Sequence, residues 1–323
     1  KGKYGVQSPK FNTFSSYDDA VNYLEQRFAA EGARKLWVKA DELCGGKGVL
    51  GVGDLEEGKE ALSLLLKEKK CGVGEKVVIQ DNVSGEEVTV QAITDGRSFV
   101  LTPSSQDHKQ IYEGGKGPNT GGMGAYSPVS VFDEDVENSF RNEILRPTAE
   151  GLEAEDLGGP GVIYFGLRLS DYGEPKVLEY NVRFGDPEAQ VVLSLLNSDL
   201  YPVLKAATQG RLEEVIDEID WKDGAAVCVV LSVGGYPVDY GDEDYPIEGI
   251  ESAERLPDVK VYHSGTTVKS GNPHTNGGRV LSVTATGSSV PDAQDRVYEA
   301  VERIHFRDMY YRSDIGDKAI DSI

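Results

Sequence analysis

Apolar residues recur at two different spacings along the first third of the chain, and the two spacings predict different elements. Residues 15–32 carry an apolar side chain every three or four positions, which predicts an amphipathic helix with Ser16 as its N-cap and Gly32 as its stop. A second helix is predicted over residues 55–69. The strands predicted here cover residues 35–40, 48–53 and 75–81, with a hairpin over 85–105 that turns at Asp95-Gly96.

The pattern changes near residue 223. Before it we expect a helix over residues 133–155, a hairpin over 161–183 and helical stretches over 187–210. After it, short strands at 225–237, 259–265 and 277–287 lead into a helix over about 291–306. We therefore place a domain boundary near residue 223 and expect a smaller α+β domain over residues 223–323.

The balance of charge is the most unusual bulk property. The 323 residues include 55 Asp and Glu against 33 Lys and Arg, a formal net charge of −22. The acidic residues are scattered, whereas binding to a nucleic-acid backbone needs clustered Lys and Arg, so we expect no nucleic-acid partner. Two interpretations of the acidic composition stay open: adaptation to high internal salt, as in a halophilic protein, or an ordinary acidic enzyme.

The apolar runs and the cysteines bear on the compartment. No apolar run reaches membrane-spanning length, so we expect no membrane partner. The three cysteines, Cys44, Cys71 and Cys228, are odd in number and lack CxxC spacing. This usage is typical of reduced thiols in a cytoplasmic protein and predicts no zinc site.

The clearest candidate site lies on the strand predicted over residues 176–183. Alternate side chains of a strand share a face, which groups Glu179, Asn181 and Arg183 opposite an apolar face that includes Val182. Carboxylate and amide oxygens suit Mg²⁺, and a guanidinium binds a phosphate or acyl-phosphate oxygen through forked hydrogen bonds. A half-buried strand with one face in solvent shows the same alternation, so that alternative stays open.

Two lysines frame a glycine-rich turn between two predicted strands. Lys39 ends one strand and Lys47 lies in the turn before the next, where the two ammonium groups are placed to straddle a polyphosphate. Glycines in such a turn let backbone N–H groups approach phosphate oxygens. The turn is not a Walker A loop, because Lys47 is followed by neither Ser nor Thr and leads into a strand. A plain hairpin turn is the alternative.

A glycine-rich loop over residues 113–128 follows three consecutive polar residues, Asp107, His108 and Lys109. Glycine loses more conformational freedom on folding than any other residue, so this loop is costly to order. An acid, an imidazole and an ammonium group lead into a backbone able to wrap a small polar molecule. The residues expected to anchor an ordered loop are Met123, Tyr126 and Pro128. The alternative is a disordered surface loop.

Four segments, in this order and spacing, are similar to one known family: residues 38–49, 104–128, 177–190 and 275–285. The chain resembles the phosphoribosylamine–glycine ligases of the ATP-grasp superfamily over essentially its whole length. The resemblance implies an ATP-grasp fold of class α+β or α/β, in which two α+β lobes clasp ATP and a smaller C-terminal α+β domain follows. The nucleotide lobe would cover about residues 33–84.

The resemblance also implies a reaction. ATP phosphorylates glycine to glycyl phosphate, which the amine of 5-phosphoribosylamine attacks to give N1-(5-phosphoribosyl)glycinamide, ADP and phosphate in purine synthesis. Mg²⁺ or Mn²⁺ would be held by Glu179 and Asn181. The catalytic residues would be Arg183, Lys47 and Asp186. The triphosphate would be bound by Lys39, Lys47, Gly45, Gly46 and Gly48.

Further residues are implied for the nucleoside and for the acceptor. Backbone groups of Gln80 and Asn82 would bind the adenine edge, and Glu86 or Glu87 would bind the ribose hydroxyls. The acceptor pocket would be lined by Asp107, His108, Lys109, Asn119, Thr120, Gly121, Gly122, Met123, Gly124 and Arg183.

The chain departs from the family pattern in three places. Residues 80–83 replace the usual glutamate pair and apolar residue. Glu42 replaces a glycine and Cys44 an alanine, and a carboxylate beside a triphosphate is unfavourable unless it points away. The family's N-terminal domain is absent, so residues 1–14 are expected to be the remnant of its linker to an ATP-grasp domain over 15–222.

Three functions follow from these observations. The first is the ligase, acting as a cytoplasmic monomer on glycine and 5-phosphoribosylamine. The second is a nucleotide-binding fragment with little catalysis, because the absent domain is expected to supply part of the acceptor site. The third is a related carboxylate–amine ligase with another acceptor, against which the loop over residues 113–128 argues.

Overall fold

The computed structural model describes residues 1–30, 35–42, 44, 48–241 and 244–320. The chain forms two compact units: the small unit comprises Gln7–Gly85, and the large unit comprises Lys1–Val6 and Glu86–Ile323. The predicted nucleotide lobe, about residues 33–84, lies within the small unit. The predicted boundary near residue 223 falls inside the large unit and does not separate two compact units.

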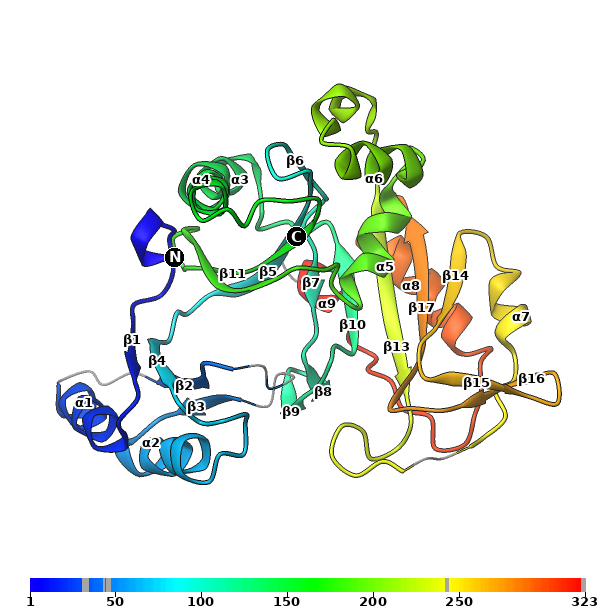
Figure 1. Cartoon of the computed structure of the whole chain (residues 1–323). Coiled ribbons are helices and arrows are strands. Elements are labelled where there is room, and N and C mark those ends of the chain that lie inside the picture. Colours follow the sequence, from blue (N-terminus) through cyan, green and yellow to red (C-terminus); the bar gives the residue numbers. More distant parts are fainter. Residues whose placement is uncertain (31–34, 43, 45–47, 242–243, 321–323) are drawn as a thin grey trace. The chain divides into compact units, whose positions relative to one another are not determined.

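In the small unit, two helices pack on one face of a four-stranded antiparallel sheet (Figure 1). The strand order is β1-β4-β2-β3, with β1 at Phe11–Phe14, β2 at Leu36–Ala40, β3 at Val49–Val52 and β4 at Val77–Asp81. Helix α1 spans Tyr17–Ala29, and α2 spans Leu55–Leu62 and continues as a π-helical turn over Ser63–Lys67. The predicted N-cap is confirmed, because the Ser16 Oγ accepts a hydrogen bond from the Asp19 N–H at 3.3 Å.

Strand β1 lies within residues 1–14, whose origin as the remnant of a linker stays a prediction. Phe11 pairs with Gln80 and Phe14 pairs with Val77 in antiparallel register. The strand is mostly exposed and shows no apolar alternation, so its sequence carries no strand signal. Backbone pairing with β4 determines its conformation. Gly32, the predicted stop of α1, lies outside the described residues.

The large unit contains two larger antiparallel sheets (Figure 1). The five-stranded sheet has the order β14-β17-β13-β10-β7, with β7 at Gln106–Asp107, β10 at Gly124–Ser127, β13 at Ala225–Ser232, β14 at Val259–His263 and β17 at Arg279–Gly287. The four-stranded sheet has the order β12-β11-β5-β6, with β5 at Glu86–Thr94, β6 at Phe99–Leu101, β11 at Gly161–Leu169 and β12 at Pro175–Asn181. Two short hairpins pair β8 (Gln110–Tyr112) with β9 (Lys116–Asn119) and β15 (Thr266–Lys269) with β16 (Asn272–Thr275).

Helices cover both faces of the five-stranded sheet. Helix α5 (Glu188–Val192) packs on the face that carries Cys228, and α8 (Val290–Val301) packs on the face that carries Val229. Helix α3 (Glu134–Phe140), a π-helical turn and α4 (Arg146–Ala154) follow one another beside the four-stranded sheet. The remaining α-helices among the described residues are α6 (Leu200–Thr208), α7 (Ile250–Glu254) and α9 (Asp317–Ile320).

Most predicted elements are confirmed, and the structure adds strand pairings that the sequence pattern did not predict. The structure contains the predicted hairpins within residues 85–105 and 161–183, as β5–β6 and β11–β12. The C-terminal strands, however, do not form a sheet of their own, because β13 pairs with β10, which pairs in turn with β7. Strand β7 lies just after the hairpin predicted over residues 85–105, and β10 lies in the segment predicted as a glycine-rich loop. Their pairing places the glycine-rich segment against a central strand of the large unit.

Phe165 lies at the centre of an aromatic cluster that joins the four-stranded sheet to its helices. Its ring centroid is 5.1 Å from that of Phe140 and 5.4 Å from that of Tyr180. We expect Phe165→Ala to lower the free energy of unfolding by about 3–5 kcal/mol, measured by urea denaturation, because a large buried side chain is lost. Tyr172→Ala, at a residue 93% exposed, is the control with little expected change. A loss below about 1 kcal/mol for Phe165→Ala would contradict this role in the core.

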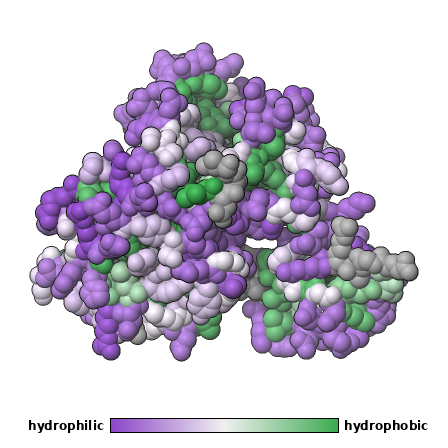
Figure 2. All heavy atoms as spheres, turned by 180° about the vertical axis from the view of Figure 1, so that it is seen from behind, coloured by the Kyte–Doolittle hydropathy of each residue, from purple (hydrophilic) through white to green (hydrophobic). Residues whose placement is uncertain are grey.

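The surface follows the charged composition. Figure 2 shows a face that is mostly hydrophilic, with small and separate apolar areas. Among the described residues, no helix combines the length and apolar character needed to cross a membrane. The three cysteines are all free thiols, as predicted.

Candidate functional site

The strand predicted to carry the metal ligands is β12, and a β-bulge changes its alternation. Glu179 pairs with Gly166, but the next pair joins Leu167 with Val177, so one residue of β12 is extra. The strand ends at Asn181, which leaves Arg183 beyond it. The predicted apolar face is therefore wrong at Val182, whose side chain is 89% exposed.

Three of the predicted site residues meet in one charged cluster. The Lys109 Nζ lies 3.3 Å from the Glu87 Oε2 and 3.8 Å from the Glu179 Oε1. On the other side of Glu87, the Arg168 Nη2 donates to the Oε1 at 2.5 Å. The cluster joins strands β5, β11 and β12 to the residues that precede β8. Arg168 was not predicted, because its position on β11 opposite Glu87 depends on the pairing of β11 with β5, two strands far apart in the sequence.

The neighbouring charges in this cluster determine the protonation states of Lys109 and Glu87. Burial by itself lowers the pKa of Lys109, but the Glu87 and Glu179 carboxylates outweigh it and raise that pKa above its usual range. Burial by itself raises the pKa of Glu87, but the Lys109 and Arg168 charges outweigh it and lower that pKa. Both groups therefore stay charged at neutral pH, which gives Lys109 a permanent positive charge beside the exposed Glu179.

The glycine-rich loop is ordered, so the alternative of a disordered surface loop is wrong. The Met123 N–H donates to the His108 carbonyl at 3.0 Å, and the Val230 N–H of β13 donates to the Met123 carbonyl at 3.0 Å. Thr120 donates to the Lys109 carbonyl through both its N–H, at 2.7 Å, and its Oγ1, at 2.8 Å. Met123 is fully buried, as the anchor prediction requires.

The predicted anchors Tyr126 and Pro128 have different outcomes. Tyr126 is buried and its hydroxyl donates to the Gln106 Oε1 at 3.0 Å, which confirms it as an anchor. Pro128 is exposed, so its prediction as an anchor is wrong. The backbone beside it is instead held through Ser127, whose Oγ donates to the Ser104 carbonyl at 2.7 Å.

Two glycines of the loop are required by close approach as well as by conformation. Gly122 has φ +111°, and a Cβ there would lie 2.4 Å from the Pro187 Cδ and 2.7 Å from the Asp107 Oδ1. Gly124 passes so close to β13 that a Cβ would lie 2.5 Å from the Cys228 carbonyl oxygen. The entropic cost of the glycines is thus offset by packing that no larger residue permits.

Arg279 of β17 ties the glycine-rich loop to the turn after β12. Its Nη1 donates to the Gly121 carbonyl at 2.8 Å and to the Asp186 carbonyl at 3.1 Å, and its Nη2 lies 2.8 Å from the Asp186 Oδ2. Asp186 also accepts a hydrogen bond from the Gln190 Nε2 at 2.8 Å. Arg279 was not among the predicted site residues, although it lies in the segment 275–285 that carries the family resemblance.

Two acidic side chains lie near this end of the loop, of which Glu188 is buried and Asp107 is half-buried. Glu188 accepts hydrogen bonds from the Tyr164 hydroxyl at 2.9 Å and from the Thr89 Oγ1 at 3.4 Å. Burial raises the pKa of Glu188. Burial, followed by the charge of Glu188, raises the pKa of Asp107 well above its usual range. Asp107 was predicted, whereas Glu188 was not, because a carboxylate after a Gly-Asp-Pro turn gives no sequence signal of burial.

Replacing Glu188 by glutamine is expected to stabilise the protein at alkaline pH. A raised pKa means that the folded state resists ionisation, so the wild type loses stability as pH rises through the usual carboxylate range up to the raised pKa. Glu188→Gln should raise the melting temperature by a few degrees at about pH 8 and leave it unchanged at about pH 4. Glu174→Gln, at an exposed site, is the control. An equal shift at both pH values would contradict this explanation.

His108 is buried and neutral. Burial lowers its pKa to about 3, so the ring carries no charge at neutral pH. Within the part of the chain that the structure describes, neither ring nitrogen has a hydrogen-bond partner, and the ring lies 6.1 Å from that of Tyr126. Its contact with a substrate stays a prediction, and such a contact would be made by an uncharged imidazole.

The candidate nucleotide residues of the small unit are only partly described. Lys39 lies on β2 as predicted, and Gly48 is buried beside Cys44. Lys47, Gly45 and Gly46 lie outside the described residues. Each of these contacts with the triphosphate stays a prediction.

Glu42, the residue that replaces a glycine of the family, has a structural role. Its carboxylate accepts hydrogen bonds from the N–H groups of Val73 at 2.5 Å, Gly74 at 2.8 Å and Glu75 at 3.3 Å. These bonds lower the pKa of Glu42 and hold its charge on the loop before β4. The carboxylate therefore points to this loop. This agrees with the expectation that a carboxylate at position 42 is unfavourable unless it points away from the triphosphate.

The side chains of the residues predicted to bind the nucleoside make contacts within the protein. The Asn82 Oδ1 accepts a hydrogen bond from the Trp37 Nε1 at 2.9 Å, and Gln80 is buried on β4. In the large unit, the Glu86 Oε2 lies 3.1 Å from the Lys318 Nζ. The backbone groups of residues 80–82 stay the predicted adenine contacts.

Glu179 and Asn181 fit Mg²⁺ by their chemistry. The Glu179 side chain is 51% exposed, and Glu179 lies two residues before Asn181 at the end of β12. Among the residues that the structure describes, no group of three or more His, Cys, Asp or Glu side chains could hold a metal ion. Mg²⁺ commonly takes only one or two protein oxygens and completes its shell with water and phosphate. The pair is therefore a sufficient protein contribution.

Comparisons with known proteins identify the family and the fold. The family described as "Phosphoribosylglycinamide synthetase, ATP-grasp (A) domain" matches residues 2–189, and its C domain matches residues 226–318. The phosphoribosylamine–glycine ligase of Rhodopirellula baltica is 42% identical over 317 residues, which cover 98% of this chain and 72% of that protein. The ligase of Neisseria meningitidis serogroup B is 41% identical over 321 residues, with coverage of 99% and 74%.

Solved structures give the same relationship. The crystal structure of phosphoribosylamine–glycine ligase from Thermotoga maritima superposes with a TM-score of 0.85 at 33% identity, covering 97% of this chain and 76% of that one. A biotin carboxylase from Campylobacter jejuni has a TM-score of 0.71 at 12% identity, covers 98% and 67%, and shows the fold alone. The chain has the predicted ATP-grasp fold and belongs to the phosphoribosylamine–glycine ligase family.

Proposed function

We propose that this protein catalyses the ATP-dependent ligation of glycine to 5-phosphoribosylamine, a step of purine biosynthesis. ATP transfers its γ-phosphoryl group to the glycine carboxylate, which forms glycyl phosphate and ADP. The amine of 5-phosphoribosylamine then attacks the acyl carbon, loses a proton and displaces phosphate to give N1-(5-phosphoribosyl)glycinamide. The observation that carries this proposal is the 42% identity to a ligase of this name over 98% of the chain.

The charged cluster and the glycine-rich loop are proposed to bind the acceptor. Lys109 keeps its positive charge beside Glu87 and Glu179, and the carbonyl of Lys109 is held by Thr120. A fixed cation next to a rigid backbone suits a phosphorylated sugar, which needs both charge and shape recognition. The proposed acceptor residues are Asp107, His108, Lys109, Asn119, Thr120, Gly121, Gly122, Met123, Gly124 and Arg183.

The phosphoryl transfer is proposed to use the cations Lys39, Lys47 and Arg183. Lys39 and Lys47, with the glycines at 45, 46 and 48, would hold the phosphates of ATP. Arg183 would stabilise the acyl phosphate and its oxyanion, since its guanidinium is exposed and donates only to the Phe184 carbonyl, at 2.7 Å, among the contacts described. Asp186 would hold the adjoining turn in place through Arg279.

Glu179 and Asn181 are proposed to hold Mg²⁺, or Mn²⁺. When bound, the ion would neutralise charge on the phosphate oxygens during transfer. The residues themselves contribute a half-exposed carboxylate and an amide oxygen on one strand end. The positive charge of Lys109 lies 3.8 Å from the Glu179 carboxylate and partly offsets its negative charge.

An ordered loop is useful to this reaction because an exposed acyl phosphate hydrolyses. Gly122 is buried against Pro187 and Asp107, and Met123 is buried against β13. These contacts exclude water from one side of the loop, as the chemistry requires. We propose that the loop both shapes the acceptor site and protects the intermediate.

The finer organisation is also proposed. We retain the domain boundary near residue 223, which lies in the interval between the two matched family domains, residues 189 and 226. A monomer in the cytoplasm agrees with three free thiols and small-molecule substrates. Size-exclusion chromatography with light scattering tests the oligomeric state, and a stable dimer would contradict it.

The reaction is tested by ADP release from ATP and Mg²⁺. Glycine and 5-phosphoribosylamine together should give sustained release, and N1-(5-phosphoribosyl)glycinamide should accumulate in a one-to-one ratio with ADP. Replacing 5-phosphoribosylamine by other amines tests the alternative of another acceptor. ATP binding without glycine-dependent release in any mixture would overturn the proposed function and support a nucleotide-binding role alone.

A further inference from the structure

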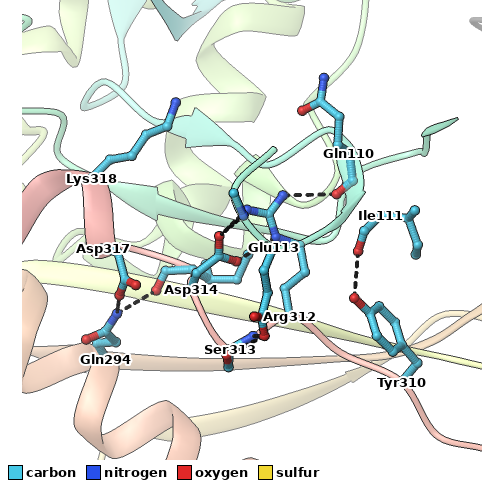
Figure 3. Close-up of polar contacts among 12 residues, drawn as sticks. Gln110, Ile111, Glu113, Gln294, Tyr310, Arg312, Ser313, Asp314, Asp317 and Lys318 are labelled. Carbon is cyan, nitrogen blue, oxygen red and sulfur yellow. Dashed lines mark hydrogen bonds and ion pairs between the residues drawn. The ribbon is translucent and has the colours of Figure 1, made fainter. Parts of the chain in front are cut away.

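The segment Tyr310–Asp314, called the C-terminal segment below, lies against residues 110–113 at the start of the hairpin β8–β9 (Figure 3). The Tyr310 hydroxyl donates to the Ile111 carbonyl at 3.0 Å, and the Ser313 Oγ donates to the Glu113 Oε1 at 2.5 Å. Two segments about two hundred residues apart in the sequence are thus joined by side-chain hydrogen bonds.

Arg312 and Asp314 hold the hairpin β8–β9 at two points. The Arg312 guanidinium pairs with both carboxylate oxygens of Asp314, at 2.7 Å and 2.6 Å, and its Nη1 donates to the Gln110 carbonyl at 3.0 Å. Asp314 in turn accepts a hydrogen bond from the Gly114 N–H at 2.8 Å. One ion pair therefore binds both the beginning of β8 and the turn that follows it.

The C-terminal segment is itself fixed to the centre of the large unit. Tyr310 and Ser232, at the end of β13, exchange backbone hydrogen bonds of 2.8 Å in both directions. Arg312 is only 3% exposed. The segment therefore holds the hairpin against a rigid strand.

A buried ion pair of this kind is a weak source of stability, because desolvation offsets its Coulombic attraction. Its geometry is specific, however, since a guanidinium fork matches a carboxylate and leaves a further donor for a carbonyl. In this structure the further donor reaches Gln110, one residue after Lys109. The pair is therefore better suited to fixing a position than to stabilising the fold.

We propose that Arg312 and Asp314 are positioning residues for the acceptor substrate. They fix the hairpin β8–β9, whose ends meet where Thr120 donates to the Lys109 carbonyl and where the Gln110 Nε2 lies 3.2 Å from the Asn119 Oδ1. The C-terminal segment thereby sets the spacing between Lys109 and the loop backbone. This inference rests on the proposed function, because it assigns these loop residues to the binding of 5-phosphoribosylamine.

Two substitutions test this role, and each removes few atoms. Arg312→Lys keeps the charge but cannot bond both Asp314 oxygens and the Gln110 carbonyl. Tyr310→Phe removes only the hydroxyl that bonds Ile111. Tyr311→Phe is the matched control, because in the described part of the chain the Tyr311 hydroxyl has no hydrogen bond to the hairpin.

The expected result is a selective loss of acceptor binding. Arg312→Lys should raise the KM for 5-phosphoribosylamine about 10-fold and Tyr310→Phe about 3-fold, as expected for one or two lost hydrogen bonds. The KM values for ATP and glycine, and kcat, should change less than about 2-fold. Amide hydrogen exchange of residues 110–120 should be faster in both variants and unchanged in Tyr311→Phe.

Other outcomes overturn the inference or the proposed function separately. An unchanged KM for 5-phosphoribosylamine, or an equal rise in all three KM values, would show that the pair serves only the fold. If the unaltered protein makes no product, the proposed function fails.

The inference is then tested by amide hydrogen exchange of residues 110–120 with and without added N1-(5-phosphoribosyl)glycinamide. If the compound slows this exchange in the unaltered protein but not in Arg312→Lys, the positioning role is supported. Any other result rejects it.

Discussion

Replacing Glu179 by alanine is expected to abolish ATP-dependent turnover, with kcat reduced at least about 1,000-fold. Glu179 is the only carboxylate of the two residues proposed to hold the metal, so its loss leaves a single neutral amide oxygen. The metal ion that would neutralise charge on the phosphate oxygens during transfer would then be bound weakly. Steady-state ADP release over a range of Mg²⁺ concentrations measures the effect, and activity should recover in part at high Mg²⁺ or Mn²⁺.

The control for this experiment lies a few residues away on the same hairpin. Glu174→Ala removes an exposed carboxylate, which is 3.8 Å from the Lys176 Nζ, from the turn before β12. It should leave kcat and the Mg²⁺ dependence unchanged. Near-normal turnover of Glu179→Ala would reject a metal role for Glu179. A loss that excess metal does not relieve would indicate that Glu179 acts through its proximity to Lys109 instead.

Elements with a strong period were predictable from the sequence. Helix α1 shows an apolar stripe and a serine cap, and both were found. Strand β13 is a run of apolar residues and becomes the central strand of its sheet. In these cases local propensity and tertiary packing favour the same structure, so the pattern alone was enough.

Elements that depend on a partner were not predictable. Strand β10, at Gly124–Ser127, carries no strand pattern and forms because β13 and β7 supply hydrogen bonds on both sides. Strand β1 is exposed and forms through pairing with β4. The bulge in β12 depends on the register with β11, which a single strand does not reveal. Period-based reasoning therefore failed where pairing decides the conformation.

The candidate site shows the same division. Glu87, Lys109 and Glu179 were all predicted, yet their meeting in one cluster depends on the order of strands in the four-stranded sheet. Arg168 and Arg279 were missed because an isolated arginine on a strand has no distinguishing neighbour in the sequence. The residues that carry chemistry were thus easier to find than the residues that hold them in place.

Arg279→Ala is expected to lower kcat/KM about 100-fold, because it removes hydrogen bonds and an ion pair worth about 3 kcal/mol together. Arg279 is the link through which the loop at Gly121 and the turn at Asp186 keep their relative positions. Without it, Asp186 would retain its carboxylate beside Gln190 but lose its only described cation. The measurement is steady-state kinetics with 5-phosphoribosylamine as the varied substrate.

The structure allows this loss to be separated from unfolding. Guanidinium ion added at millimolar concentration should restore part of the activity of Arg279→Ala, because it can occupy the vacated place between Gly121 and Asp186, and Arg279→Lys should be intermediate. Arg303→Ala is the matched control: its Nη1 donates to the Ser252 carbonyl at 3.1 Å and its Nη2 pairs with Glu299, away from the loop. Asp186→Asn combined with Arg279→Ala should cost little more than Arg279→Ala alone, because both changes break the same link. Strictly additive losses would mean that the two residues act independently, and the loop and the turn would then have to be held together by the packing of Gly122 against Pro187.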